Sequence, residues 1–269
     1  MPTRVSSFFQ LPNGRIHYIK IGNGFKLLIA FHGYGNDASM FLPLSDYLDD
    51  KYTLVSINLP HHGESMWSES ARLTIEDVGL LLQHLMIENR VNQISMIGYS
   101  MGGRVCLSVL ENMSGIVENC LLIASDGLVF NPFYYFATHT SLGNFLLKRF
   151  VQYPYNYIRF FKWLRKRKWI DAARFKFIMS YINSLEERQF LYKVWPALSL
   201  FIPNRKQLQT IIQQHNIQLI VFSGVYDRVI PPKHAVLFKR LVPSCKLIML
   251  EKGHRIYDSE TWEKINDYL

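Results

Sequence analysis

The stretch with the clearest chemical potential is residues 94–103, which contains Gly-Tyr-Ser-Met-Gly at positions 98–102. An apolar run typical of a strand opens this stretch, and residues 104–110 have the composition of a buried helix. In a strand–turn–helix context, Gly-x-Ser-x-Gly predicts a sharp turn that exposes the serine as a nucleophile. Glycine tolerates the close backbone approach and the unusual torsion angles of such a turn. Ser100 would therefore lie at the amino terminus of a helix, which favours developing negative charge.

The composition indicates a globular chain with an ample core. Hydrophobic residues make up 49% of the 269 positions, which is inconsistent with disorder. No apolar run approaches the roughly 18 residues of a membrane span, and the first ten residues lack the apolar segment of a signal peptide. Cys106, Cys120 and Cys245 form no Cys-x-x-Cys pair, so we expect reduced core cysteines in a cytoplasmic protein, without disulfides or zinc.

Strand and helix patterns alternate along most of the chain. A hairpin is expected near the amino terminus, followed by apolar strands and amphipathic helices in turn. The expected strands, besides the one before Ser100, are 25–31, 52–58, 120–125, 218–224 and 246–250, and the expected helices include 40–48, 74–89 and 233–241. This alternation predicts an α/β fold with a mostly parallel central sheet and helices on both faces. The loops after the strands would then meet at one edge of the sheet.

One region, residues 130–206, interrupts this alternation. It has no strand of the parallel-sheet type and is predicted to form several helices. Between positions 131 and 210 there are 14 Lys and Arg against three acidic residues, a net charge of +11, whereas the whole chain carries +9. We therefore predict a core of residues 1–129 and 207–269 with a basic helical insertion at 130–206.

Five stretches together resemble the α/β-hydrolase superfamily. They are His-Gly at 32–33, Asn-Leu-Pro-His-His-Gly-Glu-Ser at 58–65, Gly-Tyr-Ser-Met-Gly-Gly at 98–103, Gly-Val-Tyr-Asp-Arg-Val-Ile-Pro at 224–231 and Gly-His at 253–254. The resemblance implies the α/β-hydrolase fold, with the insertion as a helical cap, or lid. Asn58 and His61 replace an Asp and a Gly of the usual pattern, so no role for that Asp can be carried over. The serine at position 100 argues against the dehalogenase and epoxide-hydrolase branches, which need a carboxylate there.

A serine nucleophile needs a base, and the resemblance implies His254 for this role. His254 follows the last expected strand, where the superfamily places its catalytic histidine. His62 is the alternative, in another loop that follows a strand. The remaining candidates have the character of ordinary surface or partly buried histidines: His17, His84, His139, His215 and His234.

The acid that orients the histidine must follow the serine in the chain order of this fold. Asp227 follows an expected strand and a glycine and is favoured. Asp126 is the rival, because some lipases that resemble this fold carry the acid one strand earlier. An oxyanion hole would use the backbone N–H of Met101, with a second N–H from the turn after position 32, most simply that of Tyr34. His32 itself is expected to brace that turn.

These residues predict a serine hydrolase that cleaves an ester, a thioester or a related acyl bond of a small molecule, of the esterase or lipase kind. No step requires a metal or an organic cofactor, and no Walker-type phosphate loop is present. A carbon–carbon bond hydrolase with the same three residues is the nearest alternative. A ligand receptor that retains the fold is a weaker one, since the complete set of catalytic residues is present. A nucleic-acid-binding protein is not expected, because no nucleic-acid module is recognisable.

A basic amphipathic segment lies inside the insertion, at residues 157–169. Drawn as a helix, it places Tyr157, Phe160, Phe161 and Leu164 on one face and Arg159, Lys162 and Lys166 on the other. One interpretation is a cap helix that is packed by its aromatic residues and whose charges are solvated. The other is weak association with an anionic membrane surface.

Overall fold

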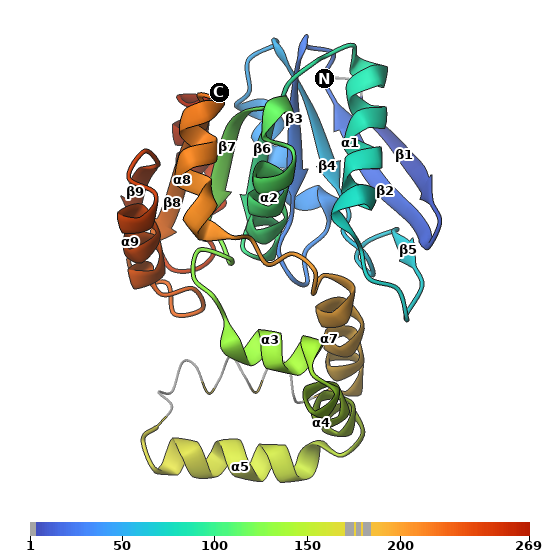
Figure 1. Ribbon diagram of the computed structural model, residues 1–269, viewed down its shortest axis with the longest axis vertical. Helices are drawn as coiled ribbons and strands as arrows, with labels where there is room; N and C mark the ends of the chain where they lie inside the picture. The colour runs from blue at the N-terminus through green and yellow to red at the C-terminus, as the bar shows by residue number, and fades with distance from the viewer. Residues whose placement is uncertain (1–3, 170–174, 176–178, 180–183) are drawn as a thin grey trace. The chain divides into compact units, whose positions relative to one another are not determined.

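The computed structural model describes residues 4–169, 175, 179 and 184–269. Its sheet has the strand order β1-β2-β4-β3-β6-β7-β8-β9, with the short β5 paired to β2 (Figure 1). The strands are β1 (Arg4–Leu11), β2 (Gly14–Ile21), β3 (Lys26–Phe31), β4 (Tyr52–Ile57), β5 (Met66–Trp67), β6 (Ile94–Tyr99), β7 (Val117–Ile123), β8 (Gln218–Gly224) and β9 (Lys246–Leu250). The first two form an antiparallel hairpin, and β2 is also antiparallel to β4. From β4 to β9 all neighbours are parallel, which confirms the predicted fold class.

Helices cover both faces of this sheet, as continuous apolar strands require. Every residue of β4 and of β6 is buried. On one face, seen at the front of Figure 1, α2 contacts both α1 and α8. On the other face η1 contacts α10. The helices of this part of the chain are η1 (Ala38–Asp46), α1 (Ile75–Asn89), α2 (Met101–Asn112), η2 (Ser114–Ile116), α8 (Arg205–Gln214), α9 (Pro232–Leu241) and α10 (Ser259–Asn266).

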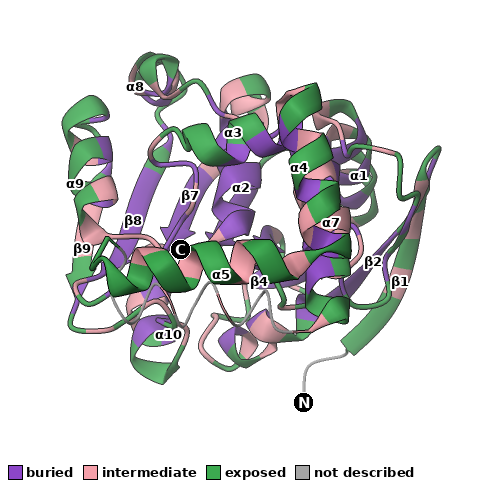
Figure 2. Cartoon of the chain, turned by 90° about the horizontal axis from the view of Figure 1, so that it is seen from below, coloured by how far each residue is buried: buried purple, intermediate pink, exposed green. Residues whose placement is uncertain are grey.

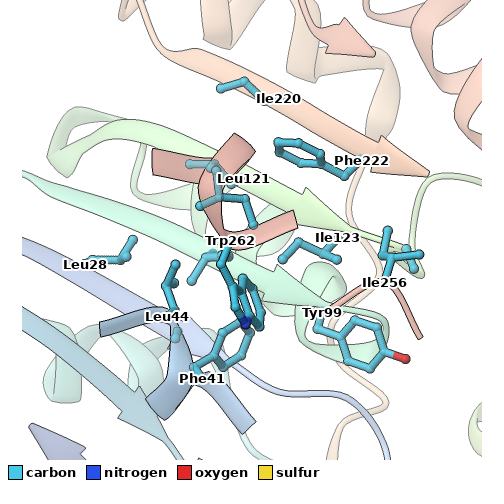
Figure 3. Close-up of a cluster of buried hydrophobic side chains, with 14 of the residues drawn as sticks. Leu28, Phe41, Leu44, Tyr99, Leu121, Ile123, Ile220, Phe222, Ile256 and Trp262 are labelled. Carbon is cyan, nitrogen blue, oxygen red and sulfur yellow. The ribbon is translucent and has the colours of Figure 1, made fainter. Parts of the chain in front are cut away.

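The apolar cluster beneath η1 and α10 anchors the strand that ends at the serine. Leu28, Tyr99, Leu121 and Phe222 come from four strands and pack under Phe41 and Trp262, whose rings lie 5.9 Å apart (Figure 3). Burial of one such side chain stabilises the fold by roughly 1.5–3 kcal/mol. Because Tyr99 directly precedes Ser100, this core also fixes the position of the strand end.

Local signals account for the helix boundaries. Thr74 caps α1 and forms a capping box with Asp77, in which each side chain accepts a hydrogen bond from the other residue's backbone N–H. Arg90 ends the helix in the left-handed conformation, with φ of 56°. The segment expected as a helix at 40–48 is instead the 3₁₀ helix η1, with Pro43 in its interior. Pro43 has no backbone N–H to continue an α-helical ladder.

The chain divides into two compact units. The core unit is Met1–Phe130 with Leu200–Leu269, and the helical unit is Asn131–Ser199. In the helical unit, Tyr134 Oη donates to Trp195 O at 2.9 Å, and Arg188 Nε donates to Val151 O at 3.2 Å. Its described helices are α3 (Pro132–His139), α4 (Ser141–Gln152), α5 (Pro154–Lys166) and α7 (Leu185–Ala197).

The predicted insertion, 130–206, is longer than the helical unit at its carboxyl end. Residues 200–206 belong to the core unit, where Asn204 N donates to Glu111 Oε2 at 2.8 Å. A role of the helical unit as a lid stays a prediction.

Cys106, Cys120 and Cys245 are all buried and free. Among the helices of the described residues, none is both long enough and apolar enough to span a bilayer.

Candidate active site

Ser100 lies at the sharp turn between β6 and α2. Its torsion angles, φ of 49° and ψ of −114°, are a strained conformation for a residue with a side chain. Backbone hydrogen bonds hold the turn, because Ser100 N donates to Ile123 O, and Ser100 O accepts from Gly103 N and Asp126 N. The strain is therefore maintained by the adjacent strand β7 and by the first turn of α2.

The two motif glycines leave no room for a side chain. A Cβ added at Gly102 would come within 1.9 Å of Phe31 O, a backbone atom at the end of β3. A Cβ at Gly98 would lie 2.8 Å from the Gly102 backbone and 2.7 Å from Cys106 Sγ. The close backbone approach predicted for this motif is thus present.

The structure brings Ser100, His254 and Asp227 together. His254 Nε2 lies 3.1 Å from Ser100 Oγ, and His254 Nδ1 lies 2.8 Å from Asp227 Oδ2. The side chain of Asp227 is fully buried, whereas 18% of the His254 side chain is exposed. This arrangement can transfer a proton from the hydroxyl to Nε2 while the carboxylate holds the proton on Nδ1.

Asp227 is fixed by the loop that carries it. Its Oδ1 accepts hydrogen bonds from the backbone N–H groups of Val229 and Ile230, both at 2.8 Å. The preceding strand end is tight, because a Cβ added at Gly224 would lie 2.2 Å from Gly253 O. The loops that carry Asp227 and His254 therefore pack directly against each other.

The alternative acid, Asp126, has a different partner. Its Oδ2 lies 3.0 Å from Arg104 Nε, and its Oδ1 accepts from Gly127 N at 2.8 Å. Arg104 belongs to α2 and is mostly buried, so Asp126 balances the charge of this guanidinium.

The alternative base, His62, supports the turn after β3. His62 Nδ1 donates to Pro60 O at 2.9 Å, which leaves Nε2 to accept from Gly35 N at 3.3 Å. His32 braces the same turn from beneath, since its Nδ1 donates to Gly33 O and its Nε2 accepts from Leu59 N. Both histidines thus connect this turn to the loop after β4.

The turn after β3 lies against Ser100. A Cβ added at Gly33 would come within 3.2 Å of Ser100 Cβ and 2.7 Å of the Tyr99 ring. Tyr34 follows in this turn, and Met101 begins α2, where the first N–H groups have no acceptor within the helix. The two candidate oxyanion residues therefore come from segments that adjoin Ser100.

The sequence assigned no role to two residues near the site, Tyr99 and Asn58. Tyr99 lies under the imidazole of His254, with ring centroids 5.3 Å apart, and its hydroxyl donates to His254 O at 3.3 Å. Asn58 accepts from Ala38 N, and its side-chain nitrogen lies 2.7 Å from His17 Nδ1. For Tyr99, the sequence offers one clue to such a role, namely its position directly before Ser100. For Asn58, the only clue is that it replaces the Asp of the superfamily pattern.

Burial holds His32 and His62 in the neutral form. It lowers the pKa of His32 to about 3, with a further contribution from His62, and it lowers the pKa of His62 to about 4. A neutral Nε2 on each ring is what the hydrogen bonds from Leu59 N and Gly35 N require.

We expect these two histidines to make the fold sensitive to acid. Both pKa values lie below the unfolded value of 6.5, so the unfolded chain alone binds these protons as the pH falls through about 6.5. Between about pH 7.5 and about pH 5.5, the pair should lower the free energy of unfolding by about 2–3 kcal/mol. Urea unfolding at both pH values measures this loss. His62→Gln, which keeps an acceptor for Gly35 N, should remove about half of it, and an unchanged pH dependence in this variant would contradict the assignment.

Comparisons with known proteins agree with the fold. The family described as alpha/beta hydrolase fold matches residues 26–261. The chain is 22% identical over 266 residues to the uncharacterized hydrolase YugF of Bacillus subtilis (strain 168), covering 97% of this chain and 95% of that protein.

Two solved structures share the fold. A hydrolase from Pseudomonas aeruginosa PA01 has a TM-score of 0.65 at 18% identity, covering 96% of both chains. A thermophilic esterase from Thermogutta terrifontis also has a TM-score of 0.65 at 18% identity, covering 99% of this chain and 97% of that one. With the family match over most of the sequence, these findings show that the chain belongs to the α/β-hydrolase fold family.

Proposed function

We propose that this protein is a serine hydrolase that cleaves a carboxylic ester, a thioester or a related acyl bond. The observation that carries the proposal is the line of hydrogen bonds from Asp227 through His254 to Ser100, at 2.8 and 3.1 Å. The esterase from Thermogutta terrifontis makes carboxylic esters the first class to test.

In the first half-reaction Ser100 Oγ attacks the carbonyl carbon while His254 Nε2 takes the hydroxyl proton. The tetrahedral intermediate then collapses, its bond to the leaving oxygen or sulfur breaks, and His254 gives its proton to that leaving group. The acyl group remains on Ser100 as an ester. In the second half-reaction His254 takes a proton from water, the resulting hydroxide attacks the acyl carbon, and Ser100 leaves with the proton from His254.

The negative oxygen of each tetrahedral intermediate needs preorganised donors. We assign this role to the backbone N–H groups of Met101 and Tyr34. The amino terminus of α2 supports the assignment, because its peptide dipoles favour negative charge near Met101. The close contact of Gly33 with Ser100 supports it for the neighbouring turn.

The helical unit is proposed as a lid that supplies an apolar lining for the acyl group. Its helices α3 and α4 carry large apolar side chains that are exposed, namely Phe133, Phe136, Leu142, Phe145 and Leu146. Apolar side chains of this kind line most small-molecule pockets, and lids exclude water from acyl transfer.

The test uses p-nitrophenyl esters of increasing acyl length together with a fluorophosphonate, which phosphonylates activated serines. We expect saturable ester hydrolysis and one covalent adduct, located at Ser100 by mass spectrometry. Ser100→Ala should abolish the adduct, and Ser108→Ala, a buried serine of α2, should retain it. Faster cleavage of a 1,3-dicarbonyl compound than of any ester would show that the reaction class is wrong while the nucleophile is right.

The same labelled protein tests the lid. A long-chain phosphonate on Ser100 should slow amide hydrogen exchange within 131–199 more than a methyl phosphonate does, because the chain would pack against the lid. Equal exchange in the two adducts would argue against an acyl-binding lid.

A further inference from the structure

Helix α5 of the helical unit has no buried residue. Tyr157 attaches it to α4, since its hydroxyl donates to Leu146 O at 3.1 Å and its ring lies 5.2 Å from that of Phe150. Ile158, Phe161 and Leu164 are partly buried on the same side. Figure 2 shows the result as a helix that is mostly exposed, with an intermediate stripe.

Away from this contact, α5 exposes large aromatic side chains. The exposed fractions are 68% for Tyr155, 53% for Phe160, 43% for Trp163 and 70% for Trp169, which follows the helix. Phe160 is therefore exposed, although the helical drawing of the sequence placed it on the same face as Tyr157, which is partly buried. Contiguous apolar side chains on a surface commonly mark a binding site.

The same surface is strongly basic. From residue 127 to residue 170 the sequence has eight Lys and Arg and no Asp or Glu, and six of these cations lie between positions 159 and 168. All six are exposed. Twelve Lys and Arg against three acidic residues give Asn131–Ser199 a net charge of +9, equal to that of the whole chain, so the core unit is balanced.

The aromatic residues form one cluster in which cations are interleaved. Phe160 and Trp163 stack with centroids 6.1 Å apart, and Trp169 meets Trp163 edge-on at 5.3 Å. The guanidinium of Arg167 lies over the Trp163 ring at 5.5 Å, and that of Arg159 over Tyr155 at 5.7 Å. Arginine and lysine can lay their apolar stems along such rings while the charged groups reach outward.

We propose that this surface, the α5 patch of Phe160, Trp163 and Trp169 with Arg159, Lys162 and Lys166, docks on an anionic phospholipid bilayer. Tryptophan rings favour the boundary between acyl chains and headgroups, and basic residues are attracted to anionic headgroups. Single-stranded nucleic acid also binds basic aromatic surfaces, but it needs open ring faces on which bases stack. At Trp163 the Phe160 ring stacks at 6.1 Å and the Arg167 guanidinium lies over the ring at 5.5 Å, which reduces the open face for a base, whereas a bilayer needs only exposed ring edges.

The test is sedimentation of the full chain with vesicles of phosphatidylcholine, alone or mixed with phosphatidylglycerol, at low and high NaCl. Binding should rise with the phosphatidylglycerol content and fall with salt, because the attraction is screened. The readout does not depend on catalysis, and Ser100→Ala should bind equally. Failure of the proposed hydrolase activity would therefore leave this result intact.

Two charge-reversed double variants test the location. Lys162→Glu with Lys166→Glu should weaken binding to the mixed vesicles by at least about tenfold, since each basic residue near an anionic surface contributes substantially. Lys233→Glu with Arg240→Glu, two exposed residues of α9, makes the same change in net charge in the core unit and should have an effect of about twofold or less. Equal weakening by both pairs would overturn the assignment to α5.

The apolar part has its own pair of variants. Phe160→Ser with Trp169→Ser should weaken binding while leaving its salt dependence in place. Phe25→Ser with Ile87→Ser, two exposed apolar residues of the core unit, should leave binding unchanged. Negligible binding to both kinds of vesicle, or binding to single-stranded DNA in their place, would overturn the proposal.

Discussion

Replacement of Ser100 by alanine is expected to lower kcat/KM for the best ester by roughly 10³–10⁶-fold, and His254→Ala by a similar factor. The two groups act in one step, because the hydroxyl at 3.1 Å from Nε2 is a useful nucleophile only if the imidazole takes its proton. The double variant should therefore be little worse than either single variant. Steady-state kinetics of the three variants measure this.

His215→Ala is the matched control for this series. His215 is exposed at the end of α8 and should be replaced with no more than about a twofold change in kcat/KM. The two effects would multiply in the double variant if Ser100 and His254 acted independently, and that outcome would contradict a joint mechanism. Near-normal turnover by Ser100→Ala would remove the proposed nucleophile altogether.

Asp227→Asn is expected to lower kcat by about 10⁴-fold while the fold stays intact. Val229 N and Ile230 N both donate to Oδ1, so the asparagine amide would keep its oxygen on that side and turn its NH₂ group toward His254. The NH₂ group would then donate to Nδ1 and leave the imidazole proton on Nε2. Such a tautomer cannot accept the proton of Ser100. Single-turnover kinetics of acylation measure the loss.

Asp126→Asn is the comparison that separates the two acids. It removes the carboxylate that lies 3.0 Å from Arg104 Nε, so we expect a loss of about 1–3 kcal/mol in stability. Its kcat should stay within about tenfold of the wild type, because Asp126 pairs with Arg104 and Gly127, whereas the carboxylate beside His254 is that of Asp227. If Asp126→Asn abolished acylation and Asp227→Asn did not, the acid would be assigned to the wrong loop.

The sequence predicted the elements of the core unit because their signals are local. Continuous apolar runs indicated the parallel strands, Thr74 and Asp77 marked the start of α1, and the glycines around Ser100 indicated the turn. Local signals predicted the helix type less well at residues 40–48, where a proline interrupts the backbone hydrogen bonds. The segment around Pro43, expected as an α-helix, is the 3₁₀ helix η1.

The choice between competing site residues depended on contacts between distant parts of the chain. Asp126 follows β7, the direct neighbour of β6, whereas Asp227 follows β8, one strand further from Ser100. Nearness in the sheet would have favoured Asp126, but Arg104 lies against it, and the loop after β9 carries His254 to Asp227.

The same holds for the residues that support the site and for α5. In the sequence, Asn58 is notable only because it replaces the Asp of the superfamily pattern. In the structure, its side chain connects Ala38 with His17. The periodicity of α5 predicted an amphipathic helix but not which side packs, and α4 contacts the side of Tyr157, so that Phe160 is left exposed. The sequence by itself determined most of the core elements and the sharp turn at the candidate nucleophile, Ser100, because strand, helix and turn signals act over a few residues. The resemblance favoured Asp227 and His254, but only the tertiary structure decided that their side chains meet and which face of α5 packs, because these pairings join loops and helices far apart in the chain.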